Sequence, residues 1–536
     1  MKTQESDFII VGGGTAGLVL ASRLSEDPSI SVTVLEAGPH FRGLNINIPA
    51  GIGKLYEQGR YHWPYKSAPE PFADDKELTY KMGRVVGGSS AINGMIWVRG
   101  NPLDYDDWAA NGCTGWSYSD IEPLFRRIES FEDKSVPEMG HEGPISVAKG
   151  RPQDQVLSNA FMESAAVAGY RINPNHNSGD QDGFCAMHRN TGKGRRSDVF
   201  QGYIAPFKQR ANLVILSGYS AQKIEFDGTA ATGVLASKNG VLQRFNARRE
   251  VLLSAGGIAS PQLLELSGVG NTDTLTSLGI TPHHHLPGVG ENFHTHPTLS
   301  LTYSCTQDSS IHGSTQLLGQ IRAGLEWLLH RTGPAATNHF EAGAFLRSHP
   351  EADRPDFQLT FLPLALAPGG MTKSSDYHGF QVYTELVGCK SRGSTHITST
   401  DSANQPLFNF NFLQDPRDKV ILREAIRVIR EVVAQAPFDE YRGQELEPGA
   451  QISSVDDIDA WMRKTVNVSH HLSGSCKMGS ADDPLAVVGP DLRVHGLQRL
   501  RVIDASIAPT VPTGNTHATT IAIGEKGADL IKSEAS

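Results

Sequence analysis

Two adjacent histidines have side chains and neighbours that could do chemistry. His470 and His471 lie in the run VNVSHHLSGSCKMG (466–479), directly before a turn of Ser, Gly and Cys. An imidazole with a pKa of about 6.5 is suited to act as a general base or a metal ligand, and it can equally be a polar surface residue. The run alone does not decide among these roles, so the choice depends on the rest of the chain.

A second group of histidines invites interpretation as a metal site. The run PHHHLPGVGENFHTHP contains His283, His284, His285, His294 and His296. No neighbouring cysteine or acidic cluster completes a ligand set, and the flanking Gly and Pro indicate a loop. We therefore predict no metal ion. The run GGSSA lacks the G-x-S-x-G spacing of a hydrolase nucleophile, so a serine hydrolase is excluded as well.

A glycine-rich turn near the N-terminus has the spacing of a dinucleotide fingerprint. A strand-like run, DFIIV, leads into Gly12, Gly14 and Gly17 and then into a helical pattern. Gly12 permits the tight turn, Gly14 lets the backbone approach a pyrophosphate, and Gly17 lets helix and strand pack closely. Because strand, turn and helix follow in this order, we interpret the turn as a nucleotide site.

The residues around this turn extend the same prediction. The helix begins with Thr15 and Ala16, whose backbone N–H groups and positive helix end would hold phosphates. Glu36 ends the next strand, 19 residues after Gly17, and would accept hydrogen bonds from the adenosine ribose. That carboxylate disfavours a 2′-phosphate. The motif does not decide between NAD and FAD.

The elements that position these residues belong to a large globular protein. The chain has 536 residues, of which 39% are hydrophobic and 20% charged, with a net charge of −10. A chain of this length exceeds one ordinary core, so we expect two domains or one large elaborated domain. The negative charge argues against a nucleic-acid partner, and no apolar window is long enough to predict a membrane span.

Cysteine usage and the N-terminus favour the cytoplasm. Five scattered cysteines have no C-x-x-C spacing and suit a reducing compartment. The chain enters a strand within its first residues and shows no export signal. We predict a cytoplasmic protein, and peripheral membrane association through a surface patch stays open.

The secondary-structure pattern changes along the chain and then returns. After the N-terminal β–α–β unit and a meander, longer strands occupy residues 299–465. The run PRDKVILREAIRVIREVVAQ predicts an amphipathic helix with apolar positions 420, 421, 425, 428, 429 and 432. The last seventy or so residues return to Gly-rich turns. The domains are therefore predicted to be interleaved.

Three further segments resemble the signature segments of one enzyme family. They are GRVVGGSSAINGMIWVRG (83–100), GGIASPQLLELSGVG (256–270) and RVIDASIAPTVPTGNTHATTIAIGEKGADLI (501–531). With the N-terminal fingerprint, and in this order, they resemble the glucose–methanol–choline (GMC) family of FAD-dependent oxidoreductases. The runs NHFEAGAFLRS and SRGSTHITSTDSANQPLFNFNFLQDPRD are most similar to choline dehydrogenases and related alcohol dehydrogenases and oxidases.

The resemblance implies an α/β fold with two interleaved parts. A Rossmann-like FAD-binding domain would alternate with a substrate domain built on an antiparallel sheet and helices. We assign residues 1–150, 193–298 and 467–536 to the FAD-binding domain. Residues 151–192 and 299–466 are assigned to the substrate-binding domain.

The resemblance also favours FAD over NAD and implies further contacts with it. By the family pattern, the residues that contact the cofactor are Gly88, Ser89, Asn93, Gly94, Met95, Ala221, Asp504 and Ala505. The Ala221 backbone would contact the adenine, and Asp504 and Ala505 would lie near the ribityl chain and pyrophosphate. Some relatives attach FAD through a histidine just before the loop asparagine. Here that position is Ile92, so we predict non-covalent FAD.

The family pattern selects one histidine of the adjacent pair. Its catalytic histidine lies seven positions before a methionine, and counting back from Met478 gives His471. The second catalytic position matches Asn515, in TGNTHATT. His471 would then act as the general base for an alcohol, and Asn515 would donate to the developing alkoxide, before hydride transfer to flavin N5. Leu472 replaces the usual proline, which puts the loop's rigidity in doubt.

The substrate is predicted less sharply than the reaction. His339 and Glu341 resemble a His-x-Glu element of choline-oxidising members, and Trp63 resembles an aromatic wall of their pocket. A carboxylate and aromatic faces suit a quaternary ammonium. Related enzymes for uncharged alcohols look similar around this Glu, however. We predict an uncharged primary alcohol, with choline or a close amino alcohol as the alternative and polyols or sugars as a third.

Other functions and partners stay open at this stage. The same fold hosts hydroxynitrile lyases, in which FAD is redox-silent, and a non-enzymatic flavin-binding role is a further alternative. Oxidase and dehydrogenase activity are not distinguished, so the electron acceptor is oxygen, a quinone or another carrier. The sequence does not predict the oligomeric state.

Overall fold

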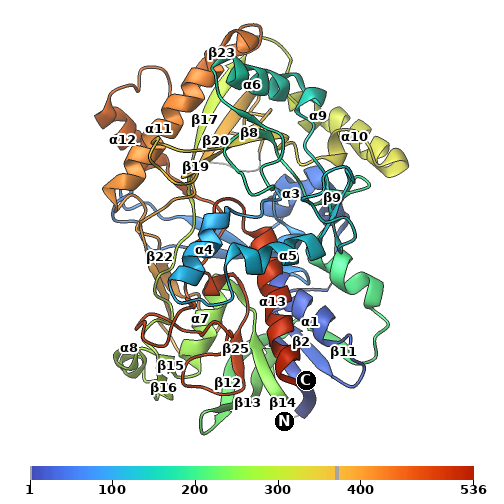
Figure 1. Ribbon diagram of the computed structural model, residues 1–536, viewed down its shortest axis with the longest axis vertical. Helices are drawn as coiled ribbons and strands as arrows, with labels where there is room; N and C mark the ends of the chain where they lie inside the picture. The colour runs from blue at the N-terminus through green and yellow to red at the C-terminus, as the bar shows by residue number, and fades with distance from the viewer. Residues whose placement is uncertain (1–2, 41, 368–372, 536) are drawn as a thin grey trace.

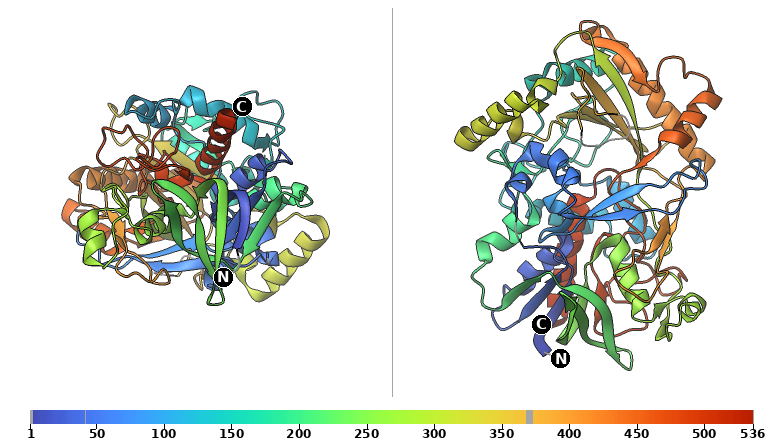
Figure 2. Two further views of the ribbon diagram at one scale, coloured as in Figure 1. Left: turned by 90° about the horizontal axis from the view of Figure 1, so that it is seen from below. Right: turned by 180° about the vertical axis from the view of Figure 1, so that it is seen from behind.

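The chain folds into two lobes, each built around one large β-sheet. The computed structural model describes residues 3–40, 42–367 and 373–535. Both chain ends lie at the bottom of the lower lobe in Figure 1, and Figure 2 shows the two lobes from below and from behind. The long C-terminal helix runs from the middle of the molecule down to this end.

The sheet of the lower lobe contains the predicted N-terminal β–α–β unit. Its strands are β1 (Thr3–Val11), β2 (Val32–Glu36), β11 (Leu213–Ser217), β12 (Ser220–Asp227), β13 (Ala230–Lys238), β14 (Val241–Leu253) and β25 (Leu500–Val502). They follow the order β11–β2–β1–β14–β13–β12, with β25 also paired to β14. The pairs among β11, β2, β1, β14 and β25 are parallel, and β12 to β14 form an antiparallel meander.

Burial on both faces explains why β1 is apolar throughout its second half. Phe8, Ile9 and Ile10 are at most 2% exposed. A central parallel strand covered by helices is expected to be apolar on both sides. Helices α1 (Thr15–Leu24) and α13 (His517–Ala535) pack against each other in this lobe. The α/β class with a Rossmann-like sheet is therefore confirmed.

The sheet of the upper lobe is mainly antiparallel. Its strands are β7 (Ile172–Asn173), β8 (Gly183–Ala186), β17 (Pro297–Cys305), β18 (Ala342–Leu346), β19 (Phe357–Leu362), β20 (Gly379–Leu386), β23 (Arg442–Glu447) and β24 (Asn467–Val468). The order is β23–β17–β20–β19–β18–β8–β7, with β24 paired to β17. Only the short β7–β8 pair, among the pairs described, is parallel.

The predicted amphipathic helix lies in the upper lobe. Helix α11 (Pro416–Val433) begins after Asp415, whose side chain accepts a hydrogen bond from the Arg417 backbone. Its buried face includes Leu422 and Ile429. The prediction for position 420 was wrong, because Val420 is 56% exposed. It lies two residues, or about 200° around the helix, from Leu422.

Shorter elements connect and flank the two sheets. The other helices are α2 (Leu44–Asn47), α3 (Ile52–Glu57), α4 (Pro102–Ala110), α5 (Tyr118–Ile128), α6 (Val156–Val167), α7 (Gly256–Leu266), α8 (Thr272–Ser277), α9 (His312–Thr315), α10 (Leu317–His330) and α12 (Val455–Thr465). The small strand pairs comprise β3 (His62–Lys66), β4 (Thr79–Gly83), β5 (Glu129–Phe131), β6 (Ile145–Val147), β9 (Thr191–Gly192), β10 (Arg195–Arg196), β15 (Val269–Gly270), β16 (His284–His285), β21 (Ser394–His396) and β22 (Leu407–Asn409). Two 3₁₀ turns matter for the site, η2 (Gly88–Ala91) and η8 (Ala505–Ile507).

The chain alternates between the two sheets. Strands of the lower sheet come from three separate stretches of sequence, and strands β7 and β8 of the upper sheet are inserted between the first two. This order agrees with interleaved domains, although the exact boundaries stay a prediction. One detail differs, because β24 (Asn467–Val468) pairs with the upper sheet while residue 467 was predicted to open the last FAD-binding segment.

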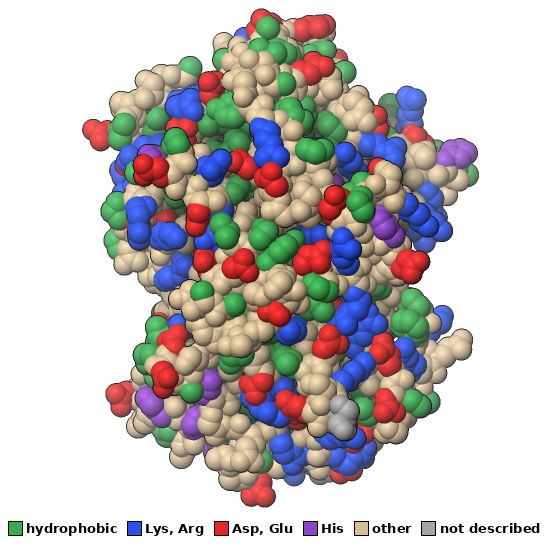
Figure 3. Space-filling view, in the orientation of Figure 1, with side chains coloured by type: hydrophobic (Ala, Val, Ile, Leu, Met, Phe, Trp, Pro, Cys, Tyr) green, Lys and Arg blue, Asp and Glu red, His purple; other side chains and the backbone are tan. Residues whose placement is uncertain are grey.

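Two further features concern the charge of the surface and the polarity of the helices. On the face drawn in Figure 3, acidic and basic side chains are interspersed, without one large basic patch. Within residues 3–40, 42–367 and 373–535, every helix is too short or too polar to cross a membrane.

Candidate active site

A cavity of about 1350 Å³ lies where residues of both lobes meet. Its lining includes Thr15 and Ser89 from the lower lobe, Glu385 from the upper lobe, and both His471 and Asn515. Cavities for one drug-sized ligand are typically about 300–1,000 Å³. The volume exceeds this range, so the cavity has room for more than one small ligand.

The fingerprint glycines are required by close backbone contacts. A Cβ on Gly12, whose φ is +103°, would lie 2.3 Å from the Ser254 carbonyl oxygen. A Cβ on Gly17 would lie 2.0 Å from the Gly12 oxygen. A Cβ on Gly14 would meet only the Gly88 Cα, at 3.9 Å, but a Cβ on Gly88 would lie 2.6 Å from the Gly14 Cα. The two glycine loops are thus in direct backbone contact at the start of α1, where Gly14 supplies no side-chain cap.

Glu36, the residue predicted to bind the ribose, lies next to the first of these loops. The side chain is buried, and its oxygens accept hydrogen bonds from the Gly13 N–H (2.9 Å) and the Gly38 N–H (2.7 Å). Burial raises the pKa of the Glu36 carboxyl to about 7, against the lowering effect of these two donors. Each oxygen keeps a lone pair for a further donor, which fits a ribose hydroxyl.

The second cofactor loop lines the cavity and is held by a buried arginine. Ser89, Asn93, Gly94 and Met95 all line it. Arg196 donates from Nη1 to the Asn93 carbonyl (2.8 Å) and to Asn93 Oδ1 (2.7 Å). Sequence reasoning did not find Arg196, because an arginine 103 residues from its partner carries no local signal.

Of the predicted cofactor residues, five line the cavity, namely Thr15, Ser89, Asn93, Gly94 and Met95. The others lie outside its lining: Gly12, Gly14, Ala16, Gly17, Glu36, Gly88, Ala221, Asp504 and Ala505. Ala221 is in β12, two residues after Tyr219, whose backbone N–H donates to the Glu36 carbonyl oxygen. Asp504 caps η8, and its oxygens accept from Gly256 N, Ser260 Oγ and Ser506 N at 2.6–2.8 Å. Asp504 and Ala505 therefore serve a structural turn in this arrangement, and their FAD contacts stay a prediction.

His471 and Asn515, which the family pattern assigned as the catalytic pair, both line the cavity and lie within hydrogen-bond distance of each other. Asn515 Nδ2 lies 3.0 Å from His471 Nε2. Asn515 Oδ1 accepts from Gln358 Nε2 at 3.2 Å, which orients the amide with its N–H toward the imidazole. His471 Nε2 is then an acceptor, so the proton of the neutral ring sits on Nδ1.

A third histidine completes this arrangement. His296 Nδ1 lies 3.0 Å from His471 Nδ1, so it accepts the Nδ1–H that the Asn515 contact implies. Burial, followed by the neighbouring His296 and His470, holds the pKa of His471 well below its usual range. The neutral imidazole therefore has its lone pair on Nε2, where it accepts the Asn515 N–H, and a substrate hydroxyl must replace that contact to reach it.

The adjacent His470 has a different environment. Its ring lies 4.8 Å from the Tyr80 ring and 5.5 Å from the Tyr56 ring, centroid to centroid. Burial lowers the pKa of His470 to about 4. It also lines the cavity, but it has no hydrogen bond to Asn515 among the described contacts.

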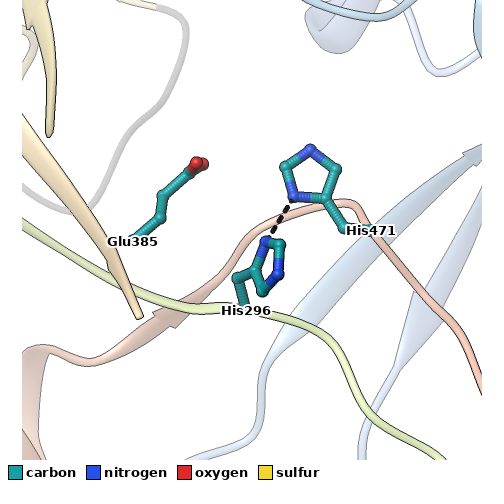
Figure 4. A group of neighbouring side chains, drawn as sticks. All are labelled: His296, Glu385 and His471. Atoms are coloured by element: carbon teal, nitrogen blue, oxygen red, sulfur yellow. Dashed lines mark hydrogen bonds between the residues drawn. The ribbon is translucent and has the colours of Figure 1, made fainter. Parts of the chain in front are cut away.

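Glu385 is a functional-site candidate that the sequence analysis missed. Figure 4 shows it converging with His296 and His471, and their potential ligand atoms lie within 4.8 Å of one another. Oε1 accepts from Ser469 Oγ at 2.8 Å, whereas Oε2 is buried and unpaired among the described atoms. Burial raises the pKa of Glu385 to about 7. The sequence signal that could have identified Glu385 is that it is the one acidic residue in the strand-like run FQVYTELVG.

The predicted substrate carboxylate is not free to bind a cation. Glu341 forms an ion pair with Arg189, accepts from Thr337 Oγ1, and accepts from the Arg151 N–H at 2.7 Å. The side chain is buried and does not line the cavity. The expectation that Glu341 faces a substrate cation is therefore not supported, because an internal arginine already neutralises it.

Of the other two predicted substrate residues, His339 and Trp63, only His339 lines the cavity. His339 lines the cavity, and burial lowers its pKa to about 4. Trp63 lies outside the lining: the Arg84 guanidinium sits 4.3 Å from its ring, and Tyr65 stacks on it at 5.9 Å. Trp63 therefore does not form a wall of the pocket in this structure.

Comparison with known proteins agrees with the geometry. The N-terminal family model described as GMC oxidoreductase matches residues 6–298, and the C-terminal model of the same description matches residues 389–524. A protein named oxygen-dependent choline dehydrogenase 1, from Chromohalobacter salexigens, is 41% identical over 535 residues, covering 99% of this chain and 95% of the relative. A Staphylococcus xylosus protein named oxygen-dependent choline dehydrogenase is also 41% identical, over 98% of this chain and 94% of its own.

Solved structures share the whole architecture. A pyridoxine 4-oxidase from Mesorbium loti superposes with a TM-score of 0.89 at 27% identity, covering 98% of this chain and 99% of that chain. A variant of formate oxidase from Aspergillus oryzae superposes with a TM-score of 0.91 at 26% identity, covering 99% and 98%.

Proposed function

The chain belongs to the GMC oxidoreductase family, and from that premise we propose that it oxidises a primary alcohol to the aldehyde with His471 as the base. The protein is an FAD-dependent oxidoreductase that acts on an alcohol. The observation that carries the finer proposal is the contact between His471 Nε2 and Asn515 Nδ2 at 3.0 Å on the cavity wall.

His471 and Asn515 have different roles: His471 accepts the proton of the alcohol, and Asn515 stabilises the negative charge on its oxygen. The unprotonated Nε2 of His471 takes the hydroxyl proton, because the neutral ring carries its own proton on Nδ1. The Asn515 N–H, released from Nε2 when the substrate hydroxyl takes its place, then donates to the alkoxide oxygen that forms. Bound FAD supplies the acceptor for the hydride that leaves the alcohol carbon. Fit to FAD is supported by the contacting glycine loops and by Glu36.

Two more side chains support the base. His296 Nδ1 accepts the His471 Nδ1–H both before and after proton transfer, and so keeps the ring in one orientation. Once His471 carries a second proton, the Glu385 carboxylate within 4.8 Å lowers the energy of the imidazolium. These are positioning roles, since neither residue touches the reacting alcohol in this arrangement.

A quaternary ammonium alcohol is a second candidate substrate. Glu385 presents an unpaired carboxylate oxygen beside the base, and Tyr383, two residues earlier on the same face of β20, also lines the cavity. A carboxylate with an aromatic face suits a trimethylammonium group, which has no hydrogen-bond donor. The relatives named choline dehydrogenase favour the same candidate.

Anaerobic flavin bleaching tests the main proposal. We expect primary alcohols to bleach the flavin of the holoenzyme in the absence of oxygen. Absence of bleaching across a panel of primary alcohols would contradict the proposal and favour the redox-silent lyase activity instead. Admission of air then decides the acceptor: rapid reoxidation identifies oxygen, and slow reoxidation that a quinone accelerates identifies a carrier.

The pH dependence of specificity tests the second candidate. Choline is compared with its uncharged isostere, 3,3-dimethylbutan-1-ol. Glu385 has a raised pKa of about 7, so it is mostly neutral below that pH and anionic above it. If Glu385 binds the cation, kcat/KM for choline relative to the isostere increases from about pH 6 to about pH 8.

A matched pair of variants separates the two carboxylates. Glu385→Gln should abolish this pH dependence, while Glu341→Gln should keep it, because Glu341 is paired with Arg189 outside the cavity. A ratio that does not change with pH in the wild type rules out the second candidate and leaves the general alcohol proposal standing.

We place the protein in the cytoplasm on the basis of its cysteines. All five are free thiols, and Cys113, Cys185, Cys389 and Cys476 are buried. Unpaired thiols in this number suit a reducing compartment.

A further inference from the structure

The cluster of His296, Glu385 and His471 has the composition of a metal site, although the spacing of histidines in the sequence predicted none. Two imidazoles and one carboxylate are a common protein ligand set for zinc, with a fourth position left to water. His296 comes from the start of the upper sheet, Glu385 from the end of β20, and His471 from the loop after β24. Figure 4 shows all three converging on one point.

The distances are close to those that a tetrahedral ion requires. Zinc–nitrogen bonds of about 2.0–2.1 Å place two ligand atoms about 3.3 Å apart. His296 Nδ1 and His471 Nδ1 are 3.0 Å apart. One ring nitrogen of each histidine and one Glu385 oxygen lie within 4.8 Å of one another, so movement of the Glu385 side chain toward the imidazoles completes the set. Its Oε2 atom has no competing partner among the described atoms.

From this geometry we propose that the cluster is a binding site for Zn²⁺ or a similar divalent transition-metal ion, and that the ion switches the base off. No bond other than coordination forms, and no electron moves. The ion takes the lone pairs of both Nδ1 atoms and one oxygen of Glu385. The proton that His471 carries on Nδ1 must therefore move to Nε2.

That tautomer change is what stops the chemistry. Nε2–H has no lone pair with which to accept the hydroxyl proton of an alcohol. The neighbouring amides can follow the change: Asn515 turns so that Oδ1 accepts from Nε2–H, and its N–H then faces Gln358. Gln358 Oε1 is buried and without a partner among the described atoms, so it can accept this N–H. Such outer partners orient metal-bound imidazoles.

Calorimetry on the oxidised holoenzyme, with no alcohol present, measures binding directly. Zinc chloride should give a saturable, one-site heat that EDTA reverses. Glu385→Gln and His296→Asn should each weaken zinc binding by at least about tenfold, since loss of even an outer partner costs 10–100-fold. His470→Asn and Glu341→Gln are the controls. His470 is half-buried and adjacent to His471 in the chain, Glu341 is buried and paired with Arg189, and neither belongs to the cluster.

Stopped-flow flavin reduction measures the consequence. Zinc should slow bleaching by alcohol without releasing FAD, and the zinc concentration needed should rise in the two cluster variants. Absence of saturable heat at millimolar zinc, or equal weakening in the control variants, overturns the metal site. The loss of base function rests on the proposed role of His471, but the calorimetry does not. Zinc binding without inhibition would therefore contradict that role and leave the metal site standing.

Discussion

At the scale of single residues, the adjacent histidines provide the sharpest test. His471→Ala should retain fold and FAD and lower the flavin reduction rate by at least about 10²-fold, as expected when a general base is removed. The rate is measured anaerobically by stopped flow at saturating alcohol. His470→Ala is the matched control, because the His470 ring packs against Tyr80 and has no hydrogen bond to Asn515 among the described contacts. If His470→Ala were the more damaging change, the register of the loop would be wrong by one residue.

Single residues also show which parts of the candidate site could be predicted from the sequence. His471 and Asn515 were identifiable because each lies at a fixed position in a local motif. His296 and Glu385 were not, because only the tertiary fold brings residues 175 and 86 positions from His471 to its side. Glu341 illustrates the opposite error. Its motif resembled a substrate contact, but Arg189, 152 residues away, neutralises it.

At the scale of elements, His396 ties β21 to the lower lobe. Its Nδ1 lies 2.7 Å from Glu265 of α7, and its Nε2 lies 3.1 Å from Glu291. Burial opposes the charged ring, but the two carboxylates outweigh it and raise the pKa of His396 to about 9. The free energy of unfolding therefore gains a contribution that is complete below about pH 6.5, the unfolded value, and is lost as pH rises through about 9.

His396→Asn measures this contribution. The variant should lower the unfolding free energy by about 2 kcal/mol at about pH 6, within the range for hydrogen bonds to charged groups, and by much less at about pH 10. Denaturant titrations at the two pH values give the difference. His330→Asn, on the exposed end of α10, should change stability little at either pH. Equal loss at both values for His396→Asn would contradict the ion-pair account.

The elements themselves were predictable to different degrees. The N-terminal β–α–β unit followed from β1, the glycine turn and Glu36, because each has a local pattern. The partners of the strands did not follow. The parallel pairing of β14 with β1 joins residues more than 230 positions apart, and the sequence pattern of neither strand indicates which strand it pairs with.

At the scale of the whole molecule, FAD should couple the two lobes. The cavity is lined from both of them, so bound FAD stabilises the native state by mass action, by about 2.7 kcal/mol at a hundredfold excess over Kd. Removing FAD should therefore lower the thermal midpoint, and adding it back should restore the midpoint.

Because Ile92 cannot form a covalent link, acid precipitation should leave yellow flavin in the supernatant. Flavin retained in the pellet would contradict non-covalent binding.

The alternation of the chain between the two sheets has a consequence for protein engineering and for descent by recombination. With the substrate region predicted at residues 151–192 and 299–466, exchanging it between relatives needs two inserts and four junctions instead of one crossover. A single crossover between residues 186 and 342 would leave β8 and β18, which pair in one sheet, from different parents. Specificity in such a fold is therefore expected to diverge by point substitution at positions such as Glu385 rather than by exchange of modules.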